Sequence, residues 1–170
     1  GDVVGFGSRV LDKSEPKYMN TPETLTYSKR RILYGMNLAK KSKRSNIILC
    51  EGNLDVVTLH QAGFDNAVAS MGTALTQEQL RLLSRYTKEL VLCYDNDNAG
   101  QQATRRALEL LNNSEFSVKV LQLPRRLVDG EYIKQDADDF IKFQGPAAFE
   151  RLLTGSENGV EFRLDQIAGK

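Results

Sequence analysis

The sequence has few of the residues that build zinc centres, disulfide scaffolds and membrane spans. Its 170 residues include two cysteines, one histidine and no tryptophan. Because Cys50 and Cys93 stand apart, with no CxxC pair, we expect no zinc site in this chain and two reduced, buried side chains of a cytosolic protein. A disulfide between neighbouring strands is the alternative. No apolar run reaches the ~20 residues that cross a bilayer, so we expect no membrane contact.

The charges divide the chain into a basic front and an acidic rear. Residues 1–45 contain ten Lys or Arg against four Asp or Glu, whereas residues 46–170 contain thirteen against eighteen, and the total is +1. This asymmetry indicates two surfaces, one suited to an anionic ligand and one suited to a cation.

From residue 46 onward, short apolar runs alternate with helical patterns. The expected strands are 47–50, 66–70, 89–94 and 117–123, and the expected helices between them are 54–63, 77–87 and 99–113. Gly63 ends the first of these helices and Thr76 caps the second. Strands that alternate with helices at this spacing predict an α/β fold whose central sheet is mainly parallel and flanked by helices.

A small basic segment precedes this region and a helical tail follows it. In the front segment we expect strand, turn and strand over 3–12, irregular chain over 15–24, and an amphipathic helix over 28–42 that Gly35 weakens. In the tail we expect helices over 136–143, 145–153 and 159–169. The basic run "KKSKR" at 40–44 we interpret as a solvated loop.

Acidic residues follow two of the expected strands, and a third acidic cluster comes later. Glu51 directly follows the first strand, Asp95 and Asp97 follow the third, and Asp136 and Asp138 follow the loop after the fourth. Ligands bind beyond the carboxyl ends of parallel strands, so we expect these side chains to meet at one edge of the sheet. Grouped carboxylates repel one another, and Mg²⁺ prefers such oxygen ligands. The pattern predicts a divalent-metal site.

Each part of this pattern also has a structural alternative. A lone Asp-x-Asp is commonly a turn or a helix cap. Acids at 136–139 suit the N-terminus of a helix, and we assign Asp139 to that role while leaving both roles open for Asp136 and Asp138. The lone His60 is expected to be packed or solvated rather than a metal ligand.

The run "SMGTALT" also has both a functional and a structural interpretation. Gly72 and Thr73 follow an expected strand, so they could cradle a phosphate. A tight turn that leads to the cap residue Thr76 explains them as well, and we favour this structural role.

Four runs, "EGNLDVV", "SMGTALT", "YDNDNAG" and "QDADDFI", resemble the signature runs of the Toprim fold in bacterial DnaG-type primases. Upstream, "GFGSRVLD", "PKYMNTPET" and "KRRILYG" resemble the segment that precedes Toprim in the same enzymes. The resemblance implies three parts: 1–45, the C-terminal part of the basic N-terminal subdomain of the polymerase core; 46–143, the Toprim domain; and 144–170, a helical tail. Two positions depart from the family, since Ala137 replaces a proline and Asn53 an aromatic residue.

The resemblance implies a role for each acid. The implied metal ligands, of which the first three are also catalytic, are Glu51, Asp95, Asp97, Asp136 and Asp138. Asp55 would support the site from the following helix. The metal would be Mg²⁺, with Mn²⁺ as a substitute, and zinc would be bound only by a domain that is absent from this chain. The residues implied to bind nucleotide or template are Arg9, Lys17, Tyr18, Asn20 and Lys29.

The function implied by the resemblance is that of a DNA primase catalytic-core fragment. Such an enzyme is a DNA-directed RNA polymerase, which makes short RNA primers for DNA replication by two-metal nucleotidyl transfer. Its partners would be single-stranded DNA, NTPs, the RNA primer and, through a domain absent here, the replicative helicase of a bacterial replication fork in the cytoplasm. Because other parts of these primases are absent, we expect this chain alone to make primers weakly or not at all.

Two other interpretations stay open. A nuclease or topoisomerase of the Toprim class would share the metal site, but topoisomerases usually carry Asp-x-Asp-x-Glu, and Ala99 stands in place of that Glu. A non-catalytic Toprim module would bind nucleic acid or a partner protein. Primer formation, DNA cleavage and binding alone distinguish the three.

Overall fold

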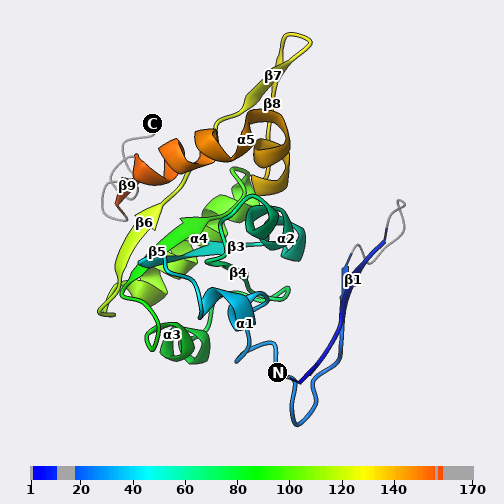
Figure 1. The fold of residues 1–170 in the computed structure, drawn as a ribbon, viewed down its shortest axis with the longest axis vertical. Coiled ribbons are helices and arrows are strands. Elements are labelled where there is room, and N and C mark those ends of the chain that lie inside the picture. Colours follow the sequence, from blue (N-terminus) through cyan, green and yellow to red (C-terminus); the bar gives the residue numbers. More distant parts are fainter. Residues whose placement is uncertain (1, 11–17, 156, 159–170) are drawn as a thin grey trace.

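The computed structural model describes residues 2–10, 18–155 and 157–158, and its centre is a five-stranded sheet (Figure 1). The strands follow the order β4-β3-β5-β6-β9, in which the first four are parallel and β9 is antiparallel. Their bounds are β3 (Asn46–Cys50), β4 (Ala67–Ala69), β5 (Glu89–Cys93), β6 (Ser117–Val120) and β9 (Glu157–Asn158). The α/β fold with a mainly parallel sheet is confirmed.

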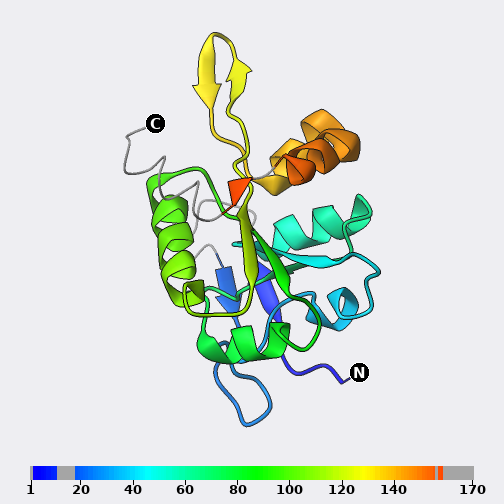
Figure 2. The ribbon, with the colours of Figure 1, turned by 90° about the vertical axis from the view of Figure 1, so that its left-hand side faces the viewer.

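Helices cover both faces of this sheet, as Figure 2 shows with the sheet seen on edge. The helices are α1 (Met36–Ala39), α2 (Asn53–Gln61), α3 (Gln77–Leu83), α4 (Asn98–Leu111) and α5 (Ala137–Thr154). One apolar cluster joins the sheet to α3 and α4, and a second joins it to α2 and α5. No helix within the described ranges is long and apolar enough to cross a bilayer.

The strand sequences explain why both faces are covered. Successive side chains of a strand point to opposite faces. In β3, Ile47 and Leu49 belong to the cluster under α3 and α4, whereas Ile48 and Cys50 belong to the cluster under α2 and α5. An all-apolar strand of this kind needs packing on both sides. Cys50 lies opposite Cys93 on β5, and both are buried, free thiols.

The prediction of a helix over 28–42 is wrong, because the first half of this segment pairs with the edge of the sheet. Tyr34 forms an antiparallel bridge with Ala69 at the edge of β4, with N–H to O distances of 2.8 and 3.1 Å. Gly35 then adopts a left-handed conformation, with φ of 81°, which a helix interior does not contain. Only the four residues of α1 remain helical. Backbone pairing with an open strand edge therefore outweighs the amphipathic pattern.

Four strands were absent from the sequence-based expectation. The stretch expected to be irregular contains β2 (Tyr18–Asn20), which pairs with β1 (Gly7–Arg9), the one strand described in the stretch where two were expected. The segment expected to be a loop before Asp136 forms a hairpin of β7 (Arg126–Val128) and β8 (Glu131–Ile133). The fourth strand is β9, in the tail expected to be helical.

The tail contains α5, which joins two of the predicted helices. They meet at Gly145, whose φ of 80° interrupts the helical conformation just before Pro146. Glycine tolerates this conformation, and proline is suited to begin a helix. The predicted helix over 159–169 lies outside the described residues. Elsewhere, Thr76 caps α3 as predicted, since its hydroxyl accepts from the N–H of Gln79 at 3.1 Å.

Candidate functional site

Glu51 and Asp95 meet at the carboxyl ends of the two central strands. Because β3 and β5 pair in register up to Cys50 and Cys93, the residues that follow leave the sheet side by side. The backbone N–H of Asp95 donates to Oε1 of Glu51 at 3.3 Å. The structure thus brings together two acids that are 44 positions apart in the sequence.

A tight turn between β5 and α4 fixes these acids. Asp97 is the N-cap of α4, and its Oδ1 accepts from the N–H of Gly100 at 2.7 Å. A Cβ atom on Gly100 would lie 2.0 Å from the carbonyl oxygen of Asp95 and 2.9 Å from Oε1 of Glu51. Only glycine permits so close an approach. The sequence pattern predicts no role for this glycine, since nothing in the local pattern shows what packs against it.

Asp55 joins α2 to the start of α5. Its carboxyl is buried and accepts from the backbone N–H groups of Gly52 and Asp138, each at 3.2 Å. These donors lie at the first turns of the two helices, where backbone N–H groups lack partners within the helix. The Asp55 side chain therefore holds two helix ends together, and its role in supporting the site stays a prediction.

The third acidic cluster forms the first turn of α5. Asp136 is the N-cap and accepts from the N–H of Asp139 at 2.8 Å. Asp138 accepts from the hydroxyl of Thr58 and forms an ion pair with Lys142. The carboxylate oxygens of Asp136, Asp138 and Asp139 lie within 4.8 Å of one another, the one such group of potential metal ligands in the part of the chain that the structure describes. Asp139, assigned above only to a helix start, thus belongs to the candidate site.

Burial and repulsion raise the pKa of two acids to near neutrality. Burial, followed by Asp95 and Asp97, raises the pKa of Glu51 to about 7. Burial, followed by Asp136 and Asp95, raises the pKa of Asp55 to about 7. Because Asp95 acts on both groups, the acids that follow β3 and β5 and those at the starts of α2 and α5 form one electrostatic cluster.

The three carboxylates at the start of α5 can meet at one divalent cation, whereas Glu51, Asp95 and Asp97 belong to no such group in the described part of the chain. Their oxygens are the ligands that Mg²⁺ prefers, and a bound cation would offset the repulsion that raises the pKa of Glu51 and Asp55. Asp138 differs from them, because hydrogen bonds from Lys142 and Thr58 outweigh its burial and hold its pKa below the ordinary value.

The β1–β2 ribbon brings a cation and a phenol to the acids. Arg9 and Tyr18 pair across the ribbon, and the guanidinium carbon lies 5.6 Å from the ring centroid. Burial raises the pKa of Tyr18, and Asp55 and Asp136 raise it further against the opposing effect of Arg9. Arg9 also helps to lower the pKa of Asp138. Of the residues expected to bind nucleotide or template, these two lie near the acids.

Family models match both parts of this arrangement. Residues 48–141, which contain the acids, match a model described as Toprim-like. The chain belongs to the Toprim-like family. Residues 1–40, which contain the β1–β2 ribbon of this Toprim-like protein, match the model of the N-terminal domain of the DNA primase catalytic core.

Known relatives of this Toprim-like chain are DNA primases. It is 43% identical over 167 residues to the DNA primase of Clostridium acetobutylicum, a match that covers 98% of this chain and 27% of that protein. The chain therefore spans about a quarter of that relative's length. Among solved structures it is similar to the Escherichia coli primase catalytic core, with a TM-score of 0.83, 37% identity, and coverage of 98% of this chain and 52% of the other.

A second solved structure is similar over the same span. It is the catalytic domain of a DnaG primase bound to single-stranded DNA, with a TM-score of 0.82 and 36% identity. The match covers 97% of this chain and 51% of that one.

Other residues expected to bind nucleotide or template in this Toprim-like chain lie farther along the basic segment. Asn20 donates to the carbonyl of Met71, in the loop after β4, at 3.4 Å. Lys29 lies beside the start of α3, where its carbonyl accepts from the side chain of Gln79 at 3.0 Å. Lys17 lies outside the described residues. The binding roles of these residues stay predictions.

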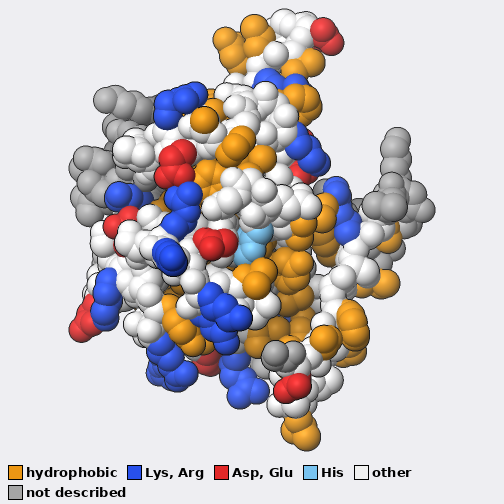
Figure 3. All heavy atoms as spheres, in the orientation of Figure 1, with side chains coloured by type: hydrophobic (Ala, Val, Ile, Leu, Met, Phe, Trp, Pro, Cys, Tyr) orange, Lys and Arg blue, Asp and Glu red, His pale blue; other side chains and the backbone are white. Residues whose placement is uncertain are grey.

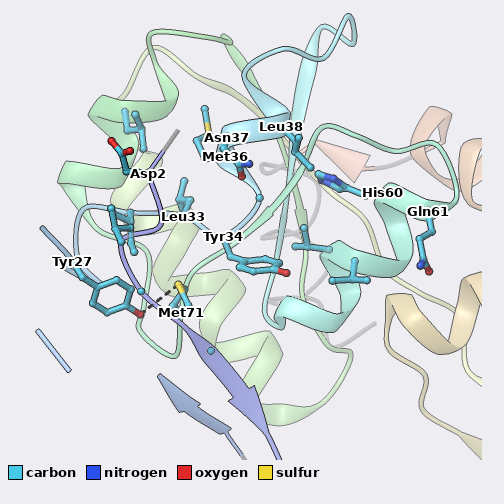
Figure 4. Close-up of a pocket in the computed structure, with 18 residues that line it drawn as sticks. Asp2, Tyr27, Leu33, Tyr34, Met36, Asn37, Leu38, His60, Gln61 and Met71 are labelled. Atoms are coloured by element: carbon cyan, nitrogen blue, oxygen red, sulfur yellow. Dashed lines mark hydrogen bonds between the residues drawn. The ribbon is translucent and has the colours of Figure 1, made fainter. Parts of the chain in front are cut away.

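A cavity of about 700 Å³ lies between the N-terminal segment, α1 and α2 (Figure 4). Its lining is mainly apolar, and hydrophobic side chains gather around this region, next to the single histidine, in Figure 3. The hydroxyl of Tyr27 donates a hydrogen bond to the sulfur of Met71 at 3.5 Å. Nε2 of His60 is hydrogen-bonded to the carbonyl of Ala67 at 2.8 Å. None of the acids of the candidate site lines this cavity, so it is a poor candidate for the chemistry.

Proposed function

We propose that this chain holds the nucleotidyl-transfer centre of a DNA primase, which makes short RNA primers on a DNA template. The observation that carries the proposal is the acidic cluster of Glu51, Asp95, Asp55 and Asp136, with the guanidinium of Arg9 close by. Such a cluster suits the binding of metal and triphosphate together. The similarity to primase catalytic cores supports a polymerase rather than another Toprim enzyme.

Each part of the chain has a role in this proposal. Residues 1–45 supply the basic surface for nucleotide and template, 46–143 form the Toprim domain, and 144–170 form the tail. A relative bound to single-stranded DNA supports such a strand as the template. NTPs and the RNA primer would be the other substrates, and a replicative helicase would contact parts of the longer protein at a bacterial, cytoplasmic replication fork.

The proposed reaction joins two nucleotides. The 3′-hydroxyl oxygen of the primer bonds to the α-phosphorus of an NTP, the bond to pyrophosphate breaks, and the hydroxyl proton moves to a base. The carboxylate of Glu51, which lies beside Asp95, would accept this proton or hold the metal. Arg9 would bind the phosphate oxygens, and Asp55 would hold the starts of α2 and α5 in place.

Four other acids would assist Glu51 as ligands of Mg²⁺, namely Asp95, Asp97, Asp136 and Asp138. When bound, the metal would lower the pKa of the attacking hydroxyl and stabilise negative charge on the phosphorus and the leaving group. Asp138 would first exchange its ion pair with Lys142 for this role. Asp139, whose oxygens lie within the same group, is a further candidate ligand.

The test follows incorporation of labelled NTPs on single-stranded DNA that carries an annealed RNA primer, in Mg²⁺ or Mn²⁺. The annealed primer avoids the initiation step. We expect weak, metal-dependent extension, or at least metal-dependent NTP binding, and we expect Asp95→Asn to abolish it. Cleavage of the same DNA would instead identify a nuclease. Nucleic-acid binding without metal-dependent NTP binding would contradict the proposal and favour a non-catalytic module.

A further inference from the structure

A second cavity, of about 270 Å³, opens beside Glu51. It lies between the loop 70–75, which follows β4, and the side of α4, and both Glu51 and Tyr94 line it. Tyr94 belongs to the apolar cluster under α3 and α4. The cavity therefore lies on the face of the sheet opposite α2 and α5, whose first turns carry Asp55 and the acids of the third cluster. Glu51 borders both regions.

One wall of this cavity carries a hydroxyl without a partner. The side-chain oxygen of Thr73 is buried, and no described group is hydrogen-bonded to it. Leaving a buried polar group unpaired costs about 1–3 kcal/mol, so such a group is usually completed by water or a ligand. The turn itself does not need this hydroxyl, because Thr76 caps α3 and the N–H of Gly72 donates to the carbonyl of Ser70 at 3.0 Å. The purely structural role favoured above thus explains Gly72 and Thr76 but not Thr73.

The other wall carries a cation. Arg106 of α4 lines the cavity and is exposed, and it forms no ion pair with any residue in the described ranges. A guanidinium binds phosphate through two parallel hydrogen bonds. A guanidinium and a hydroxyl for which the described residues supply no partner, together with the Glu51 carboxyl, match a ligand that carries a phosphate at one end and sugar hydroxyls at the other.

We propose that this cavity is a subsite for one 5′-phosphorylated nucleoside unit, with its phosphate on Arg106 and a sugar hydroxyl between Thr73 and Glu51. The inference rests on the proposed function and deepens it. The occupant would be the 3′-terminal nucleotide of the growing strand, since that nucleotide must present its hydroxyl to Glu51. The incoming triphosphate would lie on the other side of Glu51, with Asp95 and the third acidic cluster.

The test is an NMR titration of this chain with adenosine 5′-monophosphate in EDTA. Because EDTA removes metal, the result does not depend on the metal site or on polymerase activity, and the two proposals can fail separately. We expect the nucleotide to shift the backbone amides of residues 72–75 and those around Arg106. Adenosine alone and inorganic phosphate alone should each bind at least about tenfold more weakly, since each makes only part of the contacts.

Substitutions test which residues make contacts with the nucleotide. Arg106→Gln should weaken binding about tenfold and Thr73→Val about threefold, whereas Thr73→Ser, which keeps the hydroxyl, should bind as the parent does. Arg105→Gln is the matched control, because Arg105 is an exposed neighbour on the same helix that does not line the cavity. Equal effects of the two arginine variants, shifts confined to another surface, or equally tight binding of inorganic phosphate would overturn the assignment. Far-UV circular dichroism confirms that each variant folds.

Discussion

Asp55 shows how a single residue contributes to the pH dependence of the fold. Its side chain is 8% exposed, and its folded-state pKa is about 7 against an ordinary 3.8. A carboxyl whose pKa is raised on folding favours the folded state while it is protonated. Its contribution to stability is fully present below about pH 4 and is lost as pH rises through 7, because the unfolded chain then binds fewer protons than the folded one.

We therefore expect Asp55→Asn, which cannot ionise, to lose this part of the pH dependence. The difference in the free energy of unfolding between variant and parent should change by on the order of 4 kcal/mol from pH 4 to pH 8, with the variant gaining at high pH. Urea unfolding in EDTA at several pH values measures it. Parallel pH profiles would show that Asp55 is not the group responsible.

Asp97 combines two roles that substitutions can separate. Considered only as one of several like charges, its removal would leave stability unchanged or raise it. However, Asp97 caps α4 through the N–H of Gly100. We expect Asp97→Ala to lower the free energy of unfolding by about 1 kcal/mol, while Asp97→Asn keeps the cap.

Both Asp97 variants should weaken metal-dependent NTP binding, because both lose the charge. Urea unfolding in EDTA and nucleotide titration in Mg²⁺ give the two readouts. Equal stability of the alanine and asparagine variants would contradict the capping role.

At the scale of elements, the junction between β5 and α4 depends on Gly100. An added methyl group would overlap the carbonyl oxygen of Asp95, which is backbone and cannot rotate away. We expect Gly100→Ala to lower the free energy of unfolding by about 1–3 kcal/mol and to displace Glu51. Gly155→Ala is the control, since its φ is −94° and the nearest atom to the new methyl is 3.6 Å away. Equal thermal stability of the two variants would refute the close packing.

The elements that were predicted from sequence are those whose signal is local. Strands β3 and β5 are short all-apolar runs, and the acids at their ends follow from the rule that parallel strands end at one edge. The helix over 28–42 failed because Tyr34 finds a backbone partner, Ala69, that is distant in sequence. The β7–β8 hairpin did have a local signal, the Asp129–Gly130 pair, whose positive φ values of 50° and 87° are those of a tight hairpin turn.

The same distinction between local signals and partners distant in sequence applies to the site. The identity of the acids was accessible from their positions after strands, but their surroundings were not. The close approach of Gly100 to Glu51, the hydrogen bond from Asp138 to Asp55 and the cavity shared by Thr73 and Arg106 all bring together segments that are distant in sequence. Such contacts arise only when the sheet has assembled its connections in three dimensions.

At the scale of the whole molecule, opposite charges meet although they are separated along the chain. The basic front has a net charge of +6 from ten cations and four acids, and its β1–β2 ribbon lies near the acids of the Toprim-like region. A nucleotide that binds there would contact a cationic surface and metal ligands together. The chain spans about a quarter of the length of its relative from Clostridium acetobutylicum.

The central claim is that acids from separate strand ends hold a divalent cation where a nucleoside triphosphate arrives. The most direct measurement is a crystal structure of this chain soaked in Mn²⁺, with the metal located by anomalous scattering. We expect a peak within coordination distance of Glu51 and of Asp95 or Asp97, with the acids of the third cluster as further ligands. A well-ordered site with no peak among these carboxylates, or with Glu51 turned away from Asp95, would contradict the account.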